Sequence, residues 1–211
     1  HLGRGPGVLP DRRGDRHPRM NRPASRPDYL NIDFDERPVT VAWEITRACA
    51  LACRHCRAEA IPQRDPRELT EQEALGVVDQ IAELGPPVLV ITGGDPLMRP
   101  DVFDITEYAT TKGLRVALSP SATALLRREV IVRARATGVQ MLHVSLDGAS
   151  AATHDAFRGV VGSFDRTIAA LDDARSLGMP LQLGTTVTRT NAGELRAIAS
   201  IARQYGVTMW S

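Results

Sequence analysis

The chain has 211 residues, of which 43% are hydrophobic, and its formal net charge is +1 at pH 7. This length and composition suit one globular domain, or most of one, with enough chain to bury a core. Near-neutral charge and 4% aromatic residues argue against a nucleic-acid partner for the body of the chain. No apolar run approaches the roughly 18 residues of a membrane helix, so we expect no membrane partner. Clustered free cysteines without a secretory pattern predict a reducing, cytoplasmic setting.

The two ends of the chain differ from the body. Residues 1–37 begin with a basic stretch rich in Arg, Gly and Pro, which predicts disorder. Residues 1–19 precede Met20, so we expect them not to be native sequence; the alternative is a basic nucleic-acid arm. At the other end, a strand-like run begins at 207 and the sequence stops at Ser211. We therefore predict a core domain over 38–211 that is incomplete at its C-terminus.

The body alternates short apolar runs with amphipathic helical stretches. The first predicted strand, 39–45, leads directly into the cysteines. Thr70 and Glu73 have the spacing of a capping box, which predicts a helix that begins there and ends near residue 84. Further strands are predicted over 88–91, 114–118, 140–145, 181–187 and from 207 onward, with helices over 100–112, 125–137, 164–177 and 193–205.

Strands and helices that alternate at this spacing predict an α/β fold of parallel strands joined by right-handed crossovers. Six such units fit either a partial barrel or a doubly wound sheet, and the period alone does not separate the two. In both architectures, functional sites gather at the carboxyl ends of the strands. The polar segments that follow successive strand ends are therefore expected to share one site: the cysteines, then 93–95, 119–121 and 145–148.

All three cysteines of the chain, Cys49, Cys53 and Cys56, lie within eight positions. A four-iron cluster needs four ligands, so three thiolates on one loop would leave one iron open to a small molecule. A zinc site completed by His55 or His143 is the main alternative, and three unrelated buried cysteines are another. The close spacing argues against unrelated cysteines, and the cluster is favoured over zinc once the neighbouring motifs are counted.

Three cysteines with three and then two intervening residues, combined with Gly93-Gly94-Asp95 after the second strand, resemble the radical S-adenosylmethionine superfamily. The branch that it resembles often carries a C-terminal SPASM or twitch extension, and includes peptide maturases and haem-processing enzymes. The similarity extends through the motifs at 145–148, 154–155, 157–159 and 162–165.

The resemblance implies a partial (β/α)6 barrel, similar to a TIM barrel and truncated in its sixth strand. It also implies a [4Fe-4S] cluster bound by Cys49, Cys53 and Cys56, whose fourth iron chelates S-adenosylmethionine. One electron, from a donor such as flavodoxin or ferredoxin, would cleave the cofactor to a 5′-deoxyadenosyl radical. That radical would abstract hydrogen from a substrate, for which a peptide or a tetrapyrrole is expected. The alternative is a non-catalytic structural module that binds zinc or a cluster.

The resemblance also implies a site for the cofactor in the loop after the second strand. Gly93 and Gly94 lack side chains, so a ligand can approach their backbone closely. Asp95 is expected to accept from the methionyl ammonium, although relatives more often have Glu at this position.

Three further side chains are expected near the cofactor by the same resemblance. Ser145 matches a position that contacts the ribose or methionyl part, and its alternative role is to cap local backbone. Ser121 belongs to a polar turn near adenine or substrate. Arg158 would pair with the methionyl carboxylate through its fork of donors, unless it is a solvated loop residue.

Overall fold

The computed structural model describes residues 33–211. The predicted non-native origin of 1–19 and most of the predicted disorder over 1–37 fall outside the described residues. The last five residues of that segment form a turn, in which the backbone N–H groups of Glu36 and Arg37 both donate to the carbonyl of Asp33. The described structure then enters the first strand.

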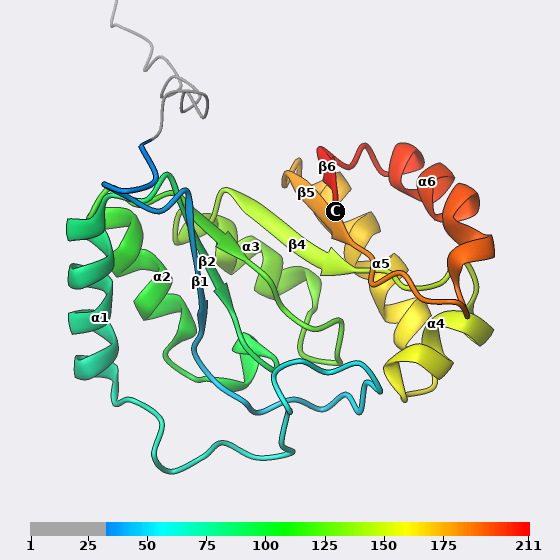
Figure 1. The fold of residues 1–211 in the computed structure, drawn as a ribbon, viewed down its shortest axis with the longest axis horizontal. Coiled ribbons are helices and arrows are strands. Elements are labelled where there is room, and N and C mark those ends of the chain that lie inside the picture. The colour runs from blue at the N-terminus through cyan, green and yellow to red at the C-terminus, as the bar shows by residue number, and fades with distance from the viewer. Residues whose placement is uncertain (1–32) are drawn as a thin grey trace, which may run out of the picture.

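Within residues 33–211, six strands form one sheet in which every neighbouring pair is parallel. Each strand pairs with the next one along the chain, whereas a doubly wound sheet reverses its order partway across. This sequential order confirms the partial barrel (Figure 1). The strands are β1 (Thr40–Glu44), β2 (Val88–Thr92), β3 (Val116–Leu118), β4 (Met141–Ser145), β5 (Leu181–Gly184) and β6 (Met209–Trp210).

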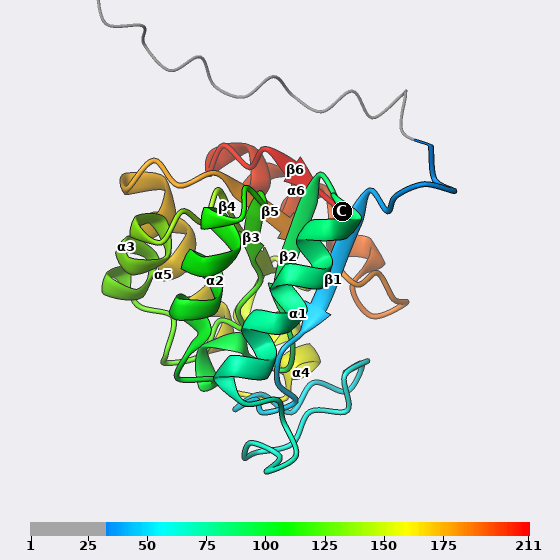
Figure 2. The same cartoon turned by 90° about the vertical axis from the view of Figure 1, so that its left-hand side faces the viewer.

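Most of the helices lie on one side of the curved sheet, while the cysteine segment, cyan in Figure 1, lies beyond the carboxyl end of β1 (Figures 1 and 2). In residues 33–211, none of the helices is long and apolar enough to span a membrane. The helices are α1 (Glu71–Leu84), α2 (Val102–Thr111), α3 (Arg128–Ala136), α4 (Ala151–Arg158), α5 (Ser163–Ser176) and α6 (Leu195–Gln204), with short 3-10 turns at Pro96–Met98 and Ala192–Glu194.

The core lies between the strands and the covering helices. Strand residues such as Leu89, Ile91, Leu142 and Leu183 are fully buried and belong to one hydrophobic cluster. Each side chain of this kind stabilises the fold by roughly 2 kcal/mol relative to an exposed position. The core therefore holds the strand ends, and the loops that follow them, in fixed relative positions.

The capping box at the start of α1 is present as the sequence predicts. The hydroxyl of Thr70 accepts from the backbone N–H of Glu73 at 3.3 Å, and the Glu73 carboxylate accepts from the backbone N–H of Thr70 at 2.8 Å. The helix ends at Gly85, which adopts the left-handed conformation with φ 62°. Helix α1 thereby returns the chain from the cysteine segment to β2.

Two elements differ from the predictions. Helix α4 was not expected, because its eight residues are too few for a clear period, although Ser150 and Gly159 cap its two ends. Strand β5 ends at Gly184 rather than at 187. The N–H of Thr185 still donates to the Ser211 carbonyl at 2.9 Å, and the N–H of Thr186 then donates to the carboxylate of Asp147 at 2.8 Å. Both differences lie beside the cavity at the carboxyl ends of the strands.

Candidate cluster and cofactor site

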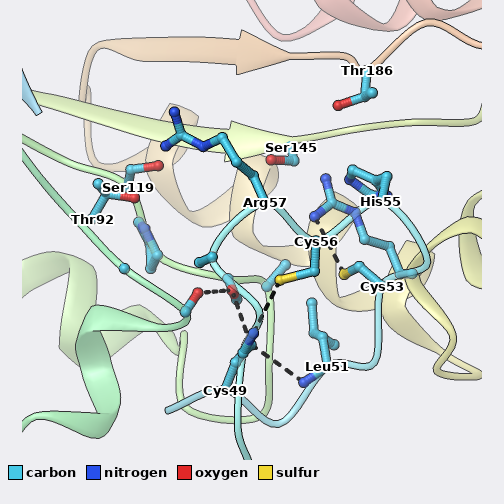
Figure 3. Close-up of a pocket in the computed structure, with 18 of the residues that line it drawn as sticks. Cys49, Leu51, Cys53, His55, Cys56, Arg57, Thr92, Ser119, Ser145 and Thr186 are labelled. Carbon is cyan, nitrogen blue, oxygen red and sulfur yellow. Dashed lines mark hydrogen bonds between the residues drawn. The ribbon is translucent and has the colours of Figure 1, made fainter. Parts of the chain in front are cut away.

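A cavity of about 480 Å³ opens where the strands of the partial barrel end (Figure 3). This volume lies in the range of small-molecule sites. The cysteine segment and the loops after β2, β3, β4 and β5 all contribute to its wall. The sequence-predicted site residues that line it are Cys49, Cys53, Cys56, Gly93, Gly94, Ser121, Ser145 and Arg158.

The cysteine segment is held by backbone hydrogen bonds and by donors that face its sulfurs. Cys49 and Ile61 pair across the segment, since the N–H of Cys49 donates to the Ile61 carbonyl at 2.9 Å. The backbone N–H of Leu51 lies 3.4 Å from the Cys49 sulfur, and that of Ala60 lies 3.4 Å from the Cys56 sulfur. These two backbone N–H groups hold the Cys49 and Cys56 sulfurs in place within the segment.

The three thiols share one cavity without converging on a single point. Across residues 33–211, no group of three or more His, Cys, Asp or Glu side chains is placed to hold a metal ion. The two histidines considered as zinc ligands have other neighbours. His55 stacks on Phe157 with ring centroids 4.3 Å apart, and Nδ1 of His143 lies 2.7 Å from the Ser119 hydroxyl. Three thiols of one segment that line one cavity are the donor type that an iron–sulfur cluster requires.

Gly93 and Gly94 line the cavity, but the structure gives them a second role. The backbone N–H of Gly94 donates to the Thr46 carbonyl at 2.8 Å, so this loop lies directly against the start of the cysteine segment. A Cβ on Gly94 would stand 2.5 Å from the Ala48 carbonyl oxygen, and one on Gly93 would overlap the Thr46 carbonyl. The glycines are therefore required for packing between the two loops, independently of any ligand.

The Asp95 carboxylate lies outside the cavity wall. It is fully buried, and its two oxygens accept from the Thr123 hydroxyl at 2.8 Å and from the Leu97 N–H at 3.1 Å. Burial raises the pKa of this carboxyl above its ordinary value. Asp95 thus joins the loops after β2 and β3, and its side chain is not among those that line the cavity.

Arg158 is the last residue of α4 and lies in the cavity wall, not in a solvated loop. Its Nη2 atom lies 2.5 Å from Oδ2 of Asp147, and its Nη1 atom lies 3.8 Å from the sulfur of Cys53. The Arg158 side chain is 12% exposed and that of Asp147 is fully buried. The sequence contains both residues, but they lie eleven positions apart. Only the fold shows that they pair.

The cavity carries a positive charge at Arg158 and neutral imidazoles around it. Burial, followed by the nearby Arg158 guanidinium, lowers the pKa of His55, His143 and His154, the last to about 4. All three are therefore neutral at pH 7. Burial raises the pKa of the Cys53 thiol, and the adjacent Arg158 partly opposes that shift.

One supporting residue was missed in the sequence. Asn191 is fully buried, and its amide donates to the carbonyls of Asp147 at 2.9 Å and Thr186 at 2.8 Å. It thereby joins the loop after β4 to the loop after β5. Its position in a run of Thr, Arg and Asn gave no signal beyond that of an ordinary turn.

A partial parallel barrel that gathers three thiols, two glycines and several hydroxyls around one cavity at its strand ends is an α/β domain with a candidate small-molecule site. Residues 43–201 match the model of the Radical SAM superfamily, and the chain belongs to that superfamily.

The chain is similar to curated relatives and to solved structures of the superfamily. It is 44% identical over 170 residues to an AdoMet-dependent heme synthase of Nitratidesulfovibrio vulgaris, covering 81% of this chain and 46% of that protein. It is 34% identical over 175 residues to the mycofactocin maturase MftC of Mycobacterium tuberculosis, covering 82% of this chain and 44% of that protein. The chain thus spans about half the length of these relatives.

Among solved structures, the fold is similar to that of Streptococcus suis SuiB bound to S-adenosylmethionine. The TM-score is 0.73 at 14% sequence identity, covering 83% of this chain and 40% of that chain. At this identity the likeness bears on the fold alone, and it agrees with the partial barrel described above.

Proposed function

We propose that this chain is the core of an enzyme that binds one [4Fe-4S] cluster through Cys49, Cys53 and Cys56 and cleaves S-adenosylmethionine reductively. The observation that carries the proposal is that all three thiols line one 480 Å³ cavity together with the loops that follow β2 to β5. When bound, the cluster and S-adenosylmethionine supply an electron and a 5′-deoxyadenosyl radical that abstracts hydrogen from the substrate. A low-potential protein such as flavodoxin or ferredoxin would supply the electron.

The residues of the chain then have distinct tasks. Ser121 joins a proposed cluster ligand to the loop after β2, because its hydroxyl lies 3.4 Å from the Cys49 sulfur and donates to the Gly94 carbonyl at 2.8 Å. Gly93, Gly94 and Ser145 form the cavity wall on which the methionyl and ribose parts of the cofactor would lie.

We propose a tetrapyrrole as the substrate. The support is the difference in identity, since the chain is 44% and 43% identical to two AdoMet-dependent heme synthases but 34% identical to MftC. A peptide substrate is the second candidate. It is supported by the similarity to MftC, a mycofactocin maturase.

The test is anaerobic reconstitution with iron and sulfide, followed by dithionite and S-adenosylmethionine. We expect a brown protein with about four irons per chain that forms 5′-deoxyadenosine. An iron tetrapyrrole that carries propionate side chains should increase this product roughly tenfold over the rate without substrate, and a maturase-type peptide should not.

One outcome would contradict the proposed enzyme, and another would contradict only the proposed substrate. A colourless protein that holds stoichiometric zinc and forms no 5′-deoxyadenosine would overturn the enzyme and support the structural module. Stimulation by the peptide, with none by the tetrapyrrole, would leave the enzyme standing and overturn only the choice of substrate.

A further inference from the structure

A buried polar contact joins the end of α4 to the cysteine segment. Nη1 of Arg158 lies 3.8 Å from the Cys53 sulfur, and the contact is drawn as a dashed line at that sulfur in Figure 3. Nη2 of the same guanidinium lies 2.5 Å from the buried carboxylate of Asp147. Arg158 therefore bridges a proposed cluster ligand and a carboxylate that follows β4.

The backbone at the end of α4 holds this bridge in place. Gly159 ends the helix in the left-handed conformation with φ 71°, and a Cβ there would overlap the carbonyl of Ala52, the residue before Cys53. The helix end is thus in direct contact with the cysteine segment. A cationic side chain at a helix C-terminus is also favoured by the helix dipole.

Asp147 is fixed as firmly as Arg158. Its Oδ1 atom accepts from the Thr186 N–H at 2.8 Å, and its backbone N–H donates to Nδ1 of His154 at 3.1 Å. Within residues 33–211, Asp147 is the one carboxylate that forms an ion pair with Arg158. The charge close to the Cys53 sulfur therefore depends on two groups, the Arg158 guanidinium and the Asp147 carboxylate that partly neutralises it.

We propose that Arg158 is a positioning residue for Cys53 that raises the reduction potential of the cluster by a charge-assisted hydrogen bond to the ligating sulfur. Asp147 moderates this effect. Reduction adds negative charge to a cluster, and hydrogen bonds to its sulfurs stabilise that charge. The inference rests on the proposed function in one respect, namely that Cys53 ligates the cluster.

This role differs from the one that the resemblance implies for Arg158. The Nη1 and Nη2 atoms of Arg158 already face Cys53 and Asp147, and Nε is the one atom of the guanidinium left without a hydrogen-bond partner among the described residues. The two roles make different predictions, because a partner of the methionyl carboxylate governs cofactor affinity, whereas a donor to the sulfur governs the potential even when no cofactor is bound.

The experiment is a redox titration of the reconstituted protein, without S-adenosylmethionine, followed by electron paramagnetic resonance. We expect Arg158→Gln to make one-electron reduction about tenfold less favourable, which is a potential lower by about 59 mV. Asp147→Asn should shift the potential in the opposite direction, because it leaves the guanidinium unneutralised. Arg158→Lys should fall between wild type and Arg158→Gln.

The matched control is Arg128→Gln, which removes another Arg–Asp pair, with Asp173 at 3.2 Å, on the outer helices α3 and α5. Its potential should equal that of wild type. Unchanged potentials in Arg158→Gln and Asp147→Asn, or shifts of both in one direction, would overturn the proposal. So would weaker cofactor binding by Arg158→Gln at an unchanged potential.

If Arg158→Gln takes up no iron, the reduction potential of Asp147→Asn alone tests the proposal. A higher potential supports it, and an unchanged or lower potential overturns it. If the wild-type chain itself takes up no iron, the proposed function is at fault, and not the role of Arg158.

Discussion

Replacing Cys53 with alanine is expected to abolish the cluster, so that bound iron falls from about four per chain to near none. Two thiolates on one loop cannot hold a cubane against loss to solvent. The formation of 5′-deoxyadenosine should fall by more than roughly 100-fold, which is the upper loss typical when a residue that only supports a metal ligand is replaced. Iron analysis, visible absorbance and product formation after anaerobic reconstitution measure these effects.

The control for this change is Ala50→Ser, at an exposed position of the same segment. It should take up iron like the wild-type chain, and both variants should keep the wild-type circular dichroism spectrum. An intact cluster in Cys53→Ala would show that the ligand assignment is wrong.

Gly94→Ala should damage both the stability of the fold and the cysteine segment. The added Cβ would stand 2.5 Å from the Ala48 carbonyl oxygen and 2.6 Å from that of Arg47, both of them backbone atoms that cannot rotate away. We expect a loss of roughly 3 kcal/mol in the free energy of unfolding. Because the displaced residues lead directly into Cys49, iron uptake should fall as well. Denaturant unfolding and iron analysis measure the two effects.

Gly76→Ala is the matched control, because a Cβ there meets nothing within 4 Å and the residue lies inside α1. It should stabilise the protein by roughly 1 kcal/mol, since alanine is the better helix former. A Gly94→Ala variant as stable as wild type, with full iron uptake, would refute the close packing of the two loops.

Much of the fold could be predicted because its elements are signalled locally. The six apolar runs and the Thr70–Glu73 capping box are visible within short windows, and the structure confirms them. The choice between a barrel and a doubly wound sheet could not be made from periodicity, because it depends on which strands pair. The family resemblance implied the barrel, and the sequential strand order confirms it.

The candidate site was less accessible to sequence reasoning. The residues at the strand ends could be named, and the structure brings most of them to one cavity, but their partners come from distant segments. Arg158 was weighed as a solvated charge because Asp147 cannot be assigned to it without the fold. Asp95 was expected to face the cofactor, yet Thr123, 28 residues later, binds its carboxylate.

The central claim is that three thiolates leave one iron of the cluster open to S-adenosylmethionine. Mössbauer spectroscopy of the iron-reconstituted protein, before and after addition of S-adenosylmethionine, tests it most directly. We predict that the cofactor makes one iron distinct from the other three, because only that iron gains nitrogen and oxygen ligands. A spectrum that S-adenosylmethionine leaves unchanged would contradict the account.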